Sequence, residues 1–346
     1  MKNMLKKLLK IGSNPIIEKI ANSYVLYSEN SSYVIRQYYL YCLQLIKDEL
    51  NNKDYAINLI FGNYYAPFPG KNNIFKIDIQ YEHTLVKPNG RSSKGAVSGN
   101  IRLNETDFYL IRIAKKSYYK SLDFIIDYSF PNLINISSHQ AFESIVKKST
   151  VISPVLYSLE KSPWIQSRKN NIITTFINEK ETRRSIILEK FKTAEIAVQN
   201  IMNTFSSEDV KSLYSNSKIL INVHQTPHHD TFEELRVLPA LLCGCIVISE
   251  NVPLKEHIPY HNYIIWADYE DIVDVAKNVS ENYDYYVRKI FDDLNLEETI
   301  NNLTTQNKNN IRQMLLSLNQ RKHGRTVAIK DKIKYYLKLF IRHYID

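Results

Sequence analysis

The stretch from Ser217 to Glu250 most narrows the folds open to this chain, because it predicts a strand, a polar loop, a helix and a second strand. Residues 218–223 are mostly apolar and predict a buried strand, which leads into a loop that contains three histidines. A second apolar strand is expected at 246–249. This order is typical of parallel α/β sheets, whose ligands bind outside the carboxyl ends of the strands.

The same alternation of strands and helices continues around this stretch. Strands are expected at Ile172–Ile177 and Tyr263–Trp266, and helices at Glu181–Thr193 and Ser207–Tyr214. The second half of the chain therefore predicts a parallel sheet that helices cover on both faces.

The first half of the chain is less regular. A helix is expected at Tyr33–Leu50, a loop at Lys87–Asn104 and a weaker strand at Ile134–Ser138. Four further strands are expected, at Ala56–Phe61, Ile74–Tyr81, Phe108–Ile113 and Leu122–Ser129. We expect two α/β domains, residues 1–157 and 158–315, followed by a basic amphipathic helical segment at 316–346, and 346 residues are enough to give each domain its own core.

The loop and helix after residue 223 hold the residues best suited to bind a phosphate. Arg236 lies in the first turns of the expected helix, where its planar guanidinium can donate paired hydrogen bonds to a diphosphate. The alternative is a surface pair with Glu233, three residues earlier. His224 follows the strand directly and is a candidate for a donor phosphate or a sugar hydroxyl, whereas His228 and His229 are expected in solvent.

Two starts are open for this helix. With Asp230 as the cap and Glu233 closing a capping box, Pro239 would fall two turns in and kink the helix. A start near Leu235 brings Pro239 closer to the first turn and leaves Glu233 and Glu234 in the loop, free to bind ribose or sugar hydroxyls.

These residues carry a resemblance to a known family. Asn222-Val223-His224, Arg236 and the segment Ala240–Gly244 resemble the donor-binding half of GT-B glycosyltransferases, closest to the spore-coat-maturation type. The resemblance is specific over about 35 residues. The chain departs from the family at Pro239, where relatives carry the glutamate that binds the donor ribose.

The resemblance implies two Rossmann-like domains that face each other across a cleft, with the last helix packed back on the first domain. It implies transfer of a sugar from a nucleotide-sugar to a hydroxyl of a surface glycan or glycolipid. Arg183 and Arg184 match the segment after the first strand of the donor domain, where they either line the phosphates or form a charged helical turn. Ser249, at the end of the second strand, is a further donor-binding candidate.

Glu82 and His83 end an expected strand of the first domain and are candidates to accept a proton from the acceptor hydroxyl. The alternative is a half-buried pair that satisfies the strand edge. Retention or inversion at the anomeric carbon stays open at this point. The departure at Pro239 leaves a second function open as well, a degenerate GT-B-like protein that binds a glycan or nucleotide-sugar without turnover.

Several other classes are disfavoured. No Gly-x-Gly-x-x-Gly follows an expected strand, no Walker motif is present and no Asp-x-Asp occurs. These absences argue against dehydrogenases, P-loop kinases and metal-dependent GT-A enzymes. We expect no cofactor and no bound metal, since helix dipoles and basic side chains neutralise the leaving diphosphate.

The net charge of +9 lies at the two ends of the chain. Residues 1–20 carry +4 and residues 321–346 carry +6, so the remainder sums to −1, which disfavours a nucleic-acid partner. Both ends have apolar stripes beside lysines, which suits either packing on the first domain or peripheral contact with an anionic membrane. Buried-type cysteines, a poor signal peptide and the lack of a transmembrane run predict a cytoplasmic protein, at most peripheral at the inner face of a membrane.

Overall fold

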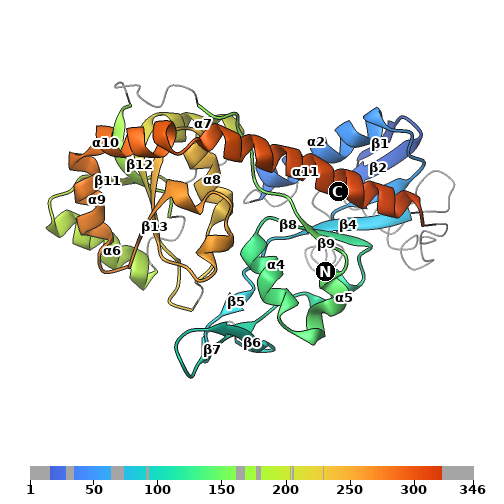
Figure 1. The fold of residues 1–346 in the computed structure, drawn as a ribbon, viewed down its shortest axis with the longest axis horizontal. Helices are drawn as coiled ribbons and strands as arrows, with labels where there is room; N and C mark the ends of the chain where they lie inside the picture. Colours follow the sequence, from blue (N-terminus) through green and yellow to red (C-terminus); the bar gives the residue numbers. More distant parts are fainter. Residues whose placement is uncertain are drawn as a thin grey trace, which may run out of the picture.

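The computed structural model describes residues 16–28, 35–63, 74–90, 93–160, 168–176, 181–202, 204, 206–228 and 230–321. These residues form a mixed α/β structure with two largely parallel sheets and one small antiparallel sheet (Figure 1). Helices are numbered from α2 and strands from β1.

The five-stranded sheet belongs to the second half of the chain and is parallel throughout, in the order β11-β10-β12-β13-β14. Its strands are β10 (Asn170–Thr174), β11 (Val198–Asn200), β12 (Ser217–Asn222), β13 (Ile246–Glu250) and β14 (Ile264–Ala267). The connecting helices are α6 (Thr182–Thr193), α7 (Ser207–Ser215) and α8 (Glu234–Leu242), and α9 (Ile272–Glu281), α10 (Tyr283–Val287) and η4 (Arg288–Asp293) follow β14. Short turns η2 (Lys255–His257) and η3 (His261–Tyr263) lie between β13 and β14.

The central strands of this sheet are buried on both faces, which explains their apolar sequence. All residues of β13 are buried, and so are those of β12 except Lys218. The chain therefore places Asn222 and Ser249, the last or nearly last residues of neighbouring strands, at the same edge of the sheet, where they pair in register.

The six-stranded sheet belongs to the first half and has the order β1-β2-β3-β4-β8-β9, parallel except for the β1–β2 hairpin. Its strands are β1 (Ile16–Ile20), β2 (Ser23–Tyr27), β3 (Asn58–Phe61), β4 (Ile74–Gln80), β8 (Phe124–Asp127) and β9 (Ser149–Val151). Its helices are α2 (Arg36–Asn52), α3 (Lys116–Lys120), α4 (Phe130–Ser137) and α5 (Glu143–Val146), with the turn η1 (Gln140–Phe142). The two large sheets have separate hydrophobic cores.

Two expectations for the first half were wrong. The segment expected as a strand at Ile134–Ser138 belongs to helix α4, because the Ser129 side chain caps its start and Pro131 occupies the first turn. The segment expected as a loop at Lys87–Asn104 contains β6 (Val97–Arg102), which joins β5 (Leu85–Val86) and β7 (Phe108–Ile111) in the antiparallel sheet β5-β7-β6.

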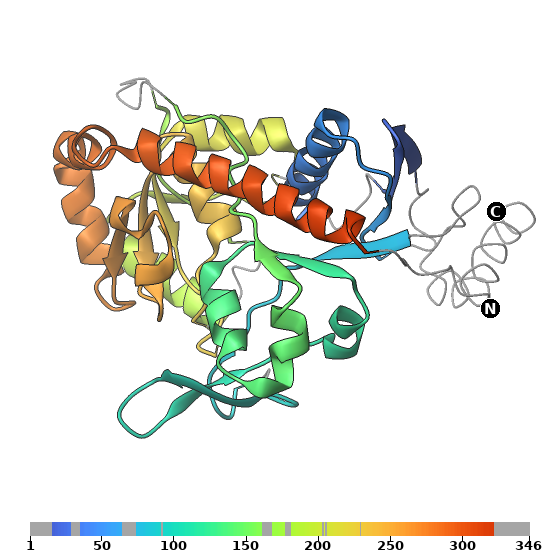
Figure 2. The same cartoon turned by 45° about the vertical axis from the view of Figure 1, so that its right-hand side comes forward.

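Helix α11 (Leu296–Asn319) links the two cores. It begins beside η4 and reaches α2 and β9, and both views show it running along one side of the molecule (Figures 1 and 2). Ile311, Met314, Leu315 and Leu318 on this helix enter the core of the six-stranded sheet. The expected helical segment at 316–346 lies outside the described residues from 322 onward.

Candidate functional site

Arg236 is held at the carboxyl ends of β12 and β13. Its Nη1 donates a hydrogen bond to Oδ1 of Asn222 at 2.9 Å, and Nδ2 of Asn222 donates to the Ser249 hydroxyl at 2.9 Å. Asn222 and Ser249 are fully buried, and the Ser249 hydroxyl is linked to Arg236 through the amide of Asn222. Helix α8 begins at Glu234, which matches the later of the two expected starts, and its positive N-terminus faces the same edge of the sheet.

Arg184 lies beside Arg236 and is only 3 % exposed. Its guanidinium lies over the Phe176 ring at 4.8 Å, and its Nε has no hydrogen-bond partner among the described residues. The pKa of Arg184 is lowered to about 10, first because burial disfavours its charge and then because the Arg236 cation is nearby. Two arginines gathered in this way favour an anion between them.

Glu233, in the loop before α8, opposes the positive charge of both arginines. Its Oε1 lies 3.7 Å from Nε2 of His83, which belongs to the segment after β4 of the other large sheet. Burial raises the pKa of Glu233, but the charges of Arg236 and Arg184 and the nearby His83 outweigh burial and lower it overall. The predicted acceptor-side histidine and a predicted donor-side glutamate are thus in contact.

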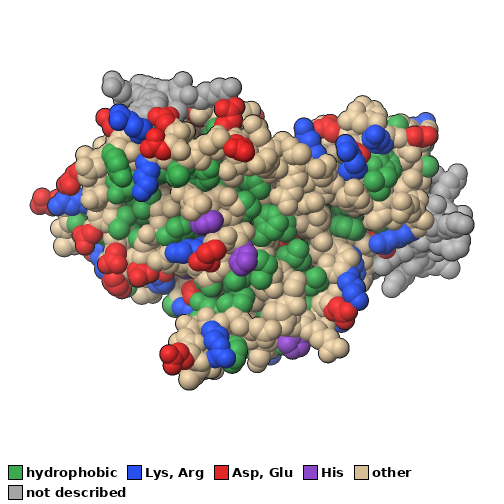
Figure 3. Space-filling model, in the orientation of Figure 1, with side chains coloured by type: hydrophobic (Ala, Val, Ile, Leu, Met, Phe, Trp, Pro, Cys, Tyr) green, Lys and Arg blue, Asp and Glu red, His purple; other side chains and the backbone are tan. Residues whose placement is uncertain are grey.

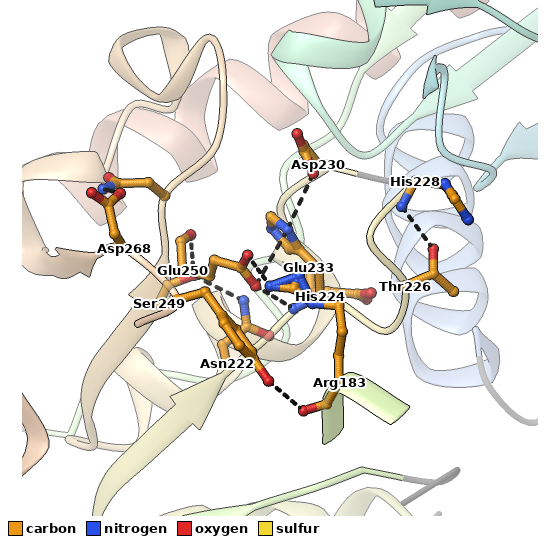
Figure 4. Close-up of polar contacts among 12 residues, drawn as sticks. Arg183, Asn222, His224, Thr226, His228, Asp230, Glu233, Ser249, Glu250 and Asp268 are labelled. Atoms are coloured by element: carbon orange, nitrogen blue, oxygen red, sulfur yellow. Dashed lines mark hydrogen bonds and ion pairs between the residues drawn. The ribbon is translucent and has the colours of Figure 1, made fainter. Parts of the chain in front are cut away.

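His224 is buried beside two carboxylates, those of Glu250 and Asp230 (Figure 4). Its backbone N–H donates to Oε2 of Glu250 at 3.0 Å. Its Nδ1 lies 3.5 Å from Oε2 of Glu250 and 3.7 Å from Oδ1 of Asp230, while neither ring nitrogen makes a hydrogen bond within the described residues. Burial lowers the pKa of His224 to about 4, although Asp230 and Glu233 oppose this, so the ring is neutral at pH 7.

Arg183 is committed to a partner within the chain. Its Nη2 pairs with Oε1 of Glu250, and its guanidinium lies over the Tyr269 ring at 4.0 Å. Burial raises the pKa of Glu250, and Arg183 opposes that rise. Of the two arginines expected at the phosphates, Arg183 is thus paired with Glu250, whereas Arg184 forms no ion pair among the described residues; the Nε of each lacks a hydrogen-bond partner there.

The small sheet β5-β7-β6 and the segment after β5 contact the loop between β12 and α8. The hydroxyl of Tyr109 and Nζ of Lys87, the latter at 3.0 Å, both contact Oδ2 of Asp230. The backbone N–H of Lys87 donates to the carbonyl of His228 at 3.1 Å. A side chain at Gly90 would begin 2.9 Å from Cβ of His228, so the two loops touch directly.

Two predicted residues face other surroundings. Oε2 of Glu82 accepts a hydrogen bond from the backbone N–H of Ala114 at 3.2 Å, and so secures a turn of the first half. Glu234 is fully buried, and its Oε2 accepts from the Tyr260 hydroxyl at 2.8 Å. Burial raises the pKa of Glu234 to about 8.

Sequence reasoning missed Asp230, Glu250, Lys87 and Tyr109 as parts of this site. Glu250 could have been predicted from the sequence, since it follows Ser249 at the end of β13 and the same strand-end rule applies to both. Lys87 and Tyr109 gave no signal, because only the packing of the small sheet brings them to the loop. Figure 3 shows basic, acidic and histidine side chains close together near the centre of the face that it presents.

Over the part of the chain that the structure describes, no group of three or more His, Cys, Asp or Glu side chains has the arrangement of a metal site. His229 lies outside that part. None of the described helices is long and apolar enough to cross a membrane.

Comparison with known proteins finds two viral relatives and a structural neighbour. No protein-family model matches the chain. "Uncharacterized protein R358" of Acanthamoeba polyphaga mimivirus is 31% identical over 115 residues, which cover 32% of this chain and 40% of that protein. "Uncharacterized protein L140" of the same virus is 24% identical over 180 residues, 51% of this chain and 57% of that protein. The chain thus spans about half the length of these curated relatives.

Among solved structures, an alpha-glucosyltransferase in complex with UDP-glucose and DNA containing an abasic site is similar at a TM-score of 0.34 and 12% identity. The match covers 79% of this chain and 80% of that one. It is a weak likeness to a GT-B-type enzyme.

Proposed function

We propose that this protein is a metal-independent glycosyltransferase of GT-B type. In this proposal residues 158–315 bind the nucleotide-sugar, residues 1–157 bind the acceptor, and the two face each other across a cleft. The observation that carries the proposal is the pair Arg184 and Arg236, one buried without a hydrogen-bond partner for its Nε among the described residues and the other held by a neutral amide. Such a pair beside a helix N-terminus suits a diphosphate.

The chemistry is attack of an acceptor hydroxyl on the anomeric carbon. A new carbon–oxygen bond forms there, the bond from that carbon to the diphosphate oxygen breaks, and the diphosphate leaves with the electron pair. Arg236, Arg184 and the N-terminus of α8 stabilise the negative charge that develops on the leaving group, which is the role that a metal ion has in other transferases.

His83 is the group that we assign to the acceptor proton. It lies on the acceptor side, and Glu233, at 3.7 Å, would stabilise the imidazolium that forms when His83 accepts the proton. This assignment favours inversion at the anomeric carbon. Glu82, whose Oε2 holds the Ala114 N–H, then acts as a positioning residue for His83.

The acceptor is proposed to be a surface glycan or glycolipid. The basic terminal segments would bring the protein to an anionic membrane surface on the cytoplasmic side. Apart from residues 16–20 and 321, these segments lie outside the described residues.

Titration of the full chain with UDP, GDP and dTDP, followed by a donor-consumption assay, tests the proposal. We expect one diphosphate to bind, and Arg236→Ala and Arg184→Ala to weaken its affinity at least about tenfold. Arg288→Ala, which removes an exposed arginine of η4, is the matched control and should change nothing. Full affinity in Arg236→Ala would refute the phosphate role. Tight binding without turnover of any donor would favour the alternative, a GT-B-like binding protein.

A further inference from the structure

The carboxylates around His224 each divide their two oxygens between a cation and the histidine. Oε1 of Glu250 pairs with Arg183, while its Oε2 lies 3.5 Å from Nδ1 of His224. Oδ2 of Asp230 contacts Lys87 and Tyr109, while its Oδ1 lies 3.7 Å from the same Nδ1. The cations are thus bound at one pair of oxygens and the histidine faces the other pair.

This arrangement determines which ring nitrogen of His224 carries the proton. The ring is 3 % exposed and neutral at pH 7. Two anionic oxygens near Nδ1 favour the tautomer with the hydrogen on Nδ1, since a lone pair there would face negative charge. Nε2 is then a hydrogen-bond acceptor, and it has no partner among the described residues.

A ligand group that binds at His224 must therefore donate hydrogen bonds. Nε2 accepts, and the nearby oxygens of Glu250 and Asp230 are negatively charged acceptors as well. Hydroxyl and ammonium groups meet this requirement. A carboxylate has no hydrogen to donate at pH 7 and would be repelled by two anionic oxygens in a poorly solvated site.

We infer that the donor sugar is neutral or amino-substituted, and that His224, Asp230 and Glu250 exclude nucleotide-activated acidic sugars. The inference rests on the proposed function, because it takes Arg184 and Arg236 to hold the diphosphate and assigns the sugar to the group formed by His224, Asp230 and Glu250. It divides the site into a cationic part for the phosphates and an acceptor-rich part that selects the sugar.

A pair of donors that differ only at carbon 6 tests the inference. The nucleotide is identified first by titrating the full chain with UDP, GDP and dTDP. UDP-glucose is then compared with UDP-glucuronate, GDP-mannose with GDP-mannuronate, or dTDP-glucose with dTDP-glucuronate, according to the nucleotide that binds. We expect the neutral donor to bind at least about tenfold more tightly than the acidic one.

Asp230→Asn and Glu250→Gln should reduce this preference to about threefold or less, because each removes one of the two charges that repel the acidic sugar. Glu281→Gln, at an exposed site on α9, is the matched control and should leave the preference unchanged. Thermal melting checks that each variant is folded. If Glu250→Gln fails to fold after losing its contact with Arg183, Asp230→Asn decides, since it keeps the Tyr109 contact.

The outcomes separate this inference from the function on which it rests. Equal or tighter binding of the acidic donor by the unmodified chain would overturn the inference and leave the proposed function in place. A preference that persists unchanged in the folded Asp230→Asn variant would also overturn it. Failure of all three nucleoside diphosphates to bind would remove the proposed function, and this inference with it.

Discussion

Arg236 is anchored by the amide of Asn222, through a hydrogen bond of 2.9 Å from Nη1 to Oδ1, and not by a carboxylate. Asn222 is itself held by the Ser249 hydroxyl of the neighbouring strand. A neutral amide fixes the direction of the guanidinium without forming an ion pair with it, and the opposing charge nearby is that of Glu233. Arg236 is thus oriented by residues of β12 and β13, and among the described residues its guanidinium is not paired with a carboxylate that would compete with a ligand.

Asn222→Asp should replace the neutral anchor of Arg236 with a charged one. The new carboxylate would form an ion pair with Arg236 in a partly buried place and compete with a phosphate. We expect the affinity for the bound nucleoside diphosphate to fall about tenfold or more, as measured by calorimetric titration. Asn282→Asp, which adds the same charge at an exposed position after α9, is the control. Unchanged affinity in Asn222→Asp would show that Arg236 does not contact the phosphates.

The strands of the second half of the chain could be predicted because they depend on residues that are close together in the sequence. Strands expected at 218–223 and 246–249 form at Ser217–Asn222 and Ile246–Glu250, since strands buried on both faces require continuous apolar runs between turn signals. The strand-end rule also located Asn222, His224 and Arg236 at one edge of the sheet. Sequence patterns were enough to predict structure where the contacting residues are also close in the sequence.

The first half and the fine structure of the site were not predictable in this way. The start of α4 depends on the Ser129 cap and Pro131, a short signal that the apolar residues after it obscured. The contact of Tyr109 with Asp230 joins residues 121 positions apart, and the burial of Glu234 depends on Tyr260 of another loop. Such long-range packing leaves no periodicity in the sequence.

Glu234 and Asp127 should make stability depend on pH. Both are buried, and burial raises their pKa values to about 8 and about 7, from 4.5 and 3.8. The folded state therefore binds these protons more tightly than the unfolded chain does. Their contribution to stability is full below the unfolded values and is lost as the pH rises from about 4 to about 8.

Glu234→Gln should remove much of this dependence, because the amide cannot ionise. We expect the free energy of unfolding at pH 8 to rise by on the order of 2 kcal/mol and to change little at pH 5. Urea unfolding at pH 5, 6.5 and 8 measures both values, with Glu281→Gln as the exposed control. A variant with the pH slope of the unmodified chain would rule out Glu234 as a source of that slope.

Tyr109→Phe tests the link between the small sheet and the loop after β12. The Tyr109 hydroxyl contacts Asp230, and its loss should lower the free energy of unfolding by about 1 kcal/mol. Because Oδ2 of Asp230 would lose one of its two described contacts and keep Lys87, we also expect weaker donor binding, read as a higher KM with a nearly constant kcat. Tyr285→Phe, at a side chain that is 60 % exposed, should change neither quantity. Unaltered KM and stability in Tyr109→Phe would show that the contact between Tyr109 and Asp230 does not hold the loop after β12 in place.

Arg184 and Arg183 offer the sharpest contrast, since adjacent arginines are expected to respond in opposite ways. Arg184 is buried against Phe176 and forms no ion pair within the described ranges, so its burial costs stability that Glu233 offsets in part and that a bound anion would offset further. Arg184→Met keeps the packing and removes the charge. It should raise the free energy of unfolding of the ligand-free protein by about 1 kcal/mol and weaken nucleoside diphosphate binding more than about tenfold.

Arg183→Met instead leaves Glu250 without its cation and should destabilise the protein by about 2 kcal/mol. Urea unfolding with and without the diphosphate measures both effects. Destabilisation by Arg184→Met to the same extent as by Arg183→Met would mean that Arg184 has a structural role, and the proposed phosphate site would then rest on Arg236 alone.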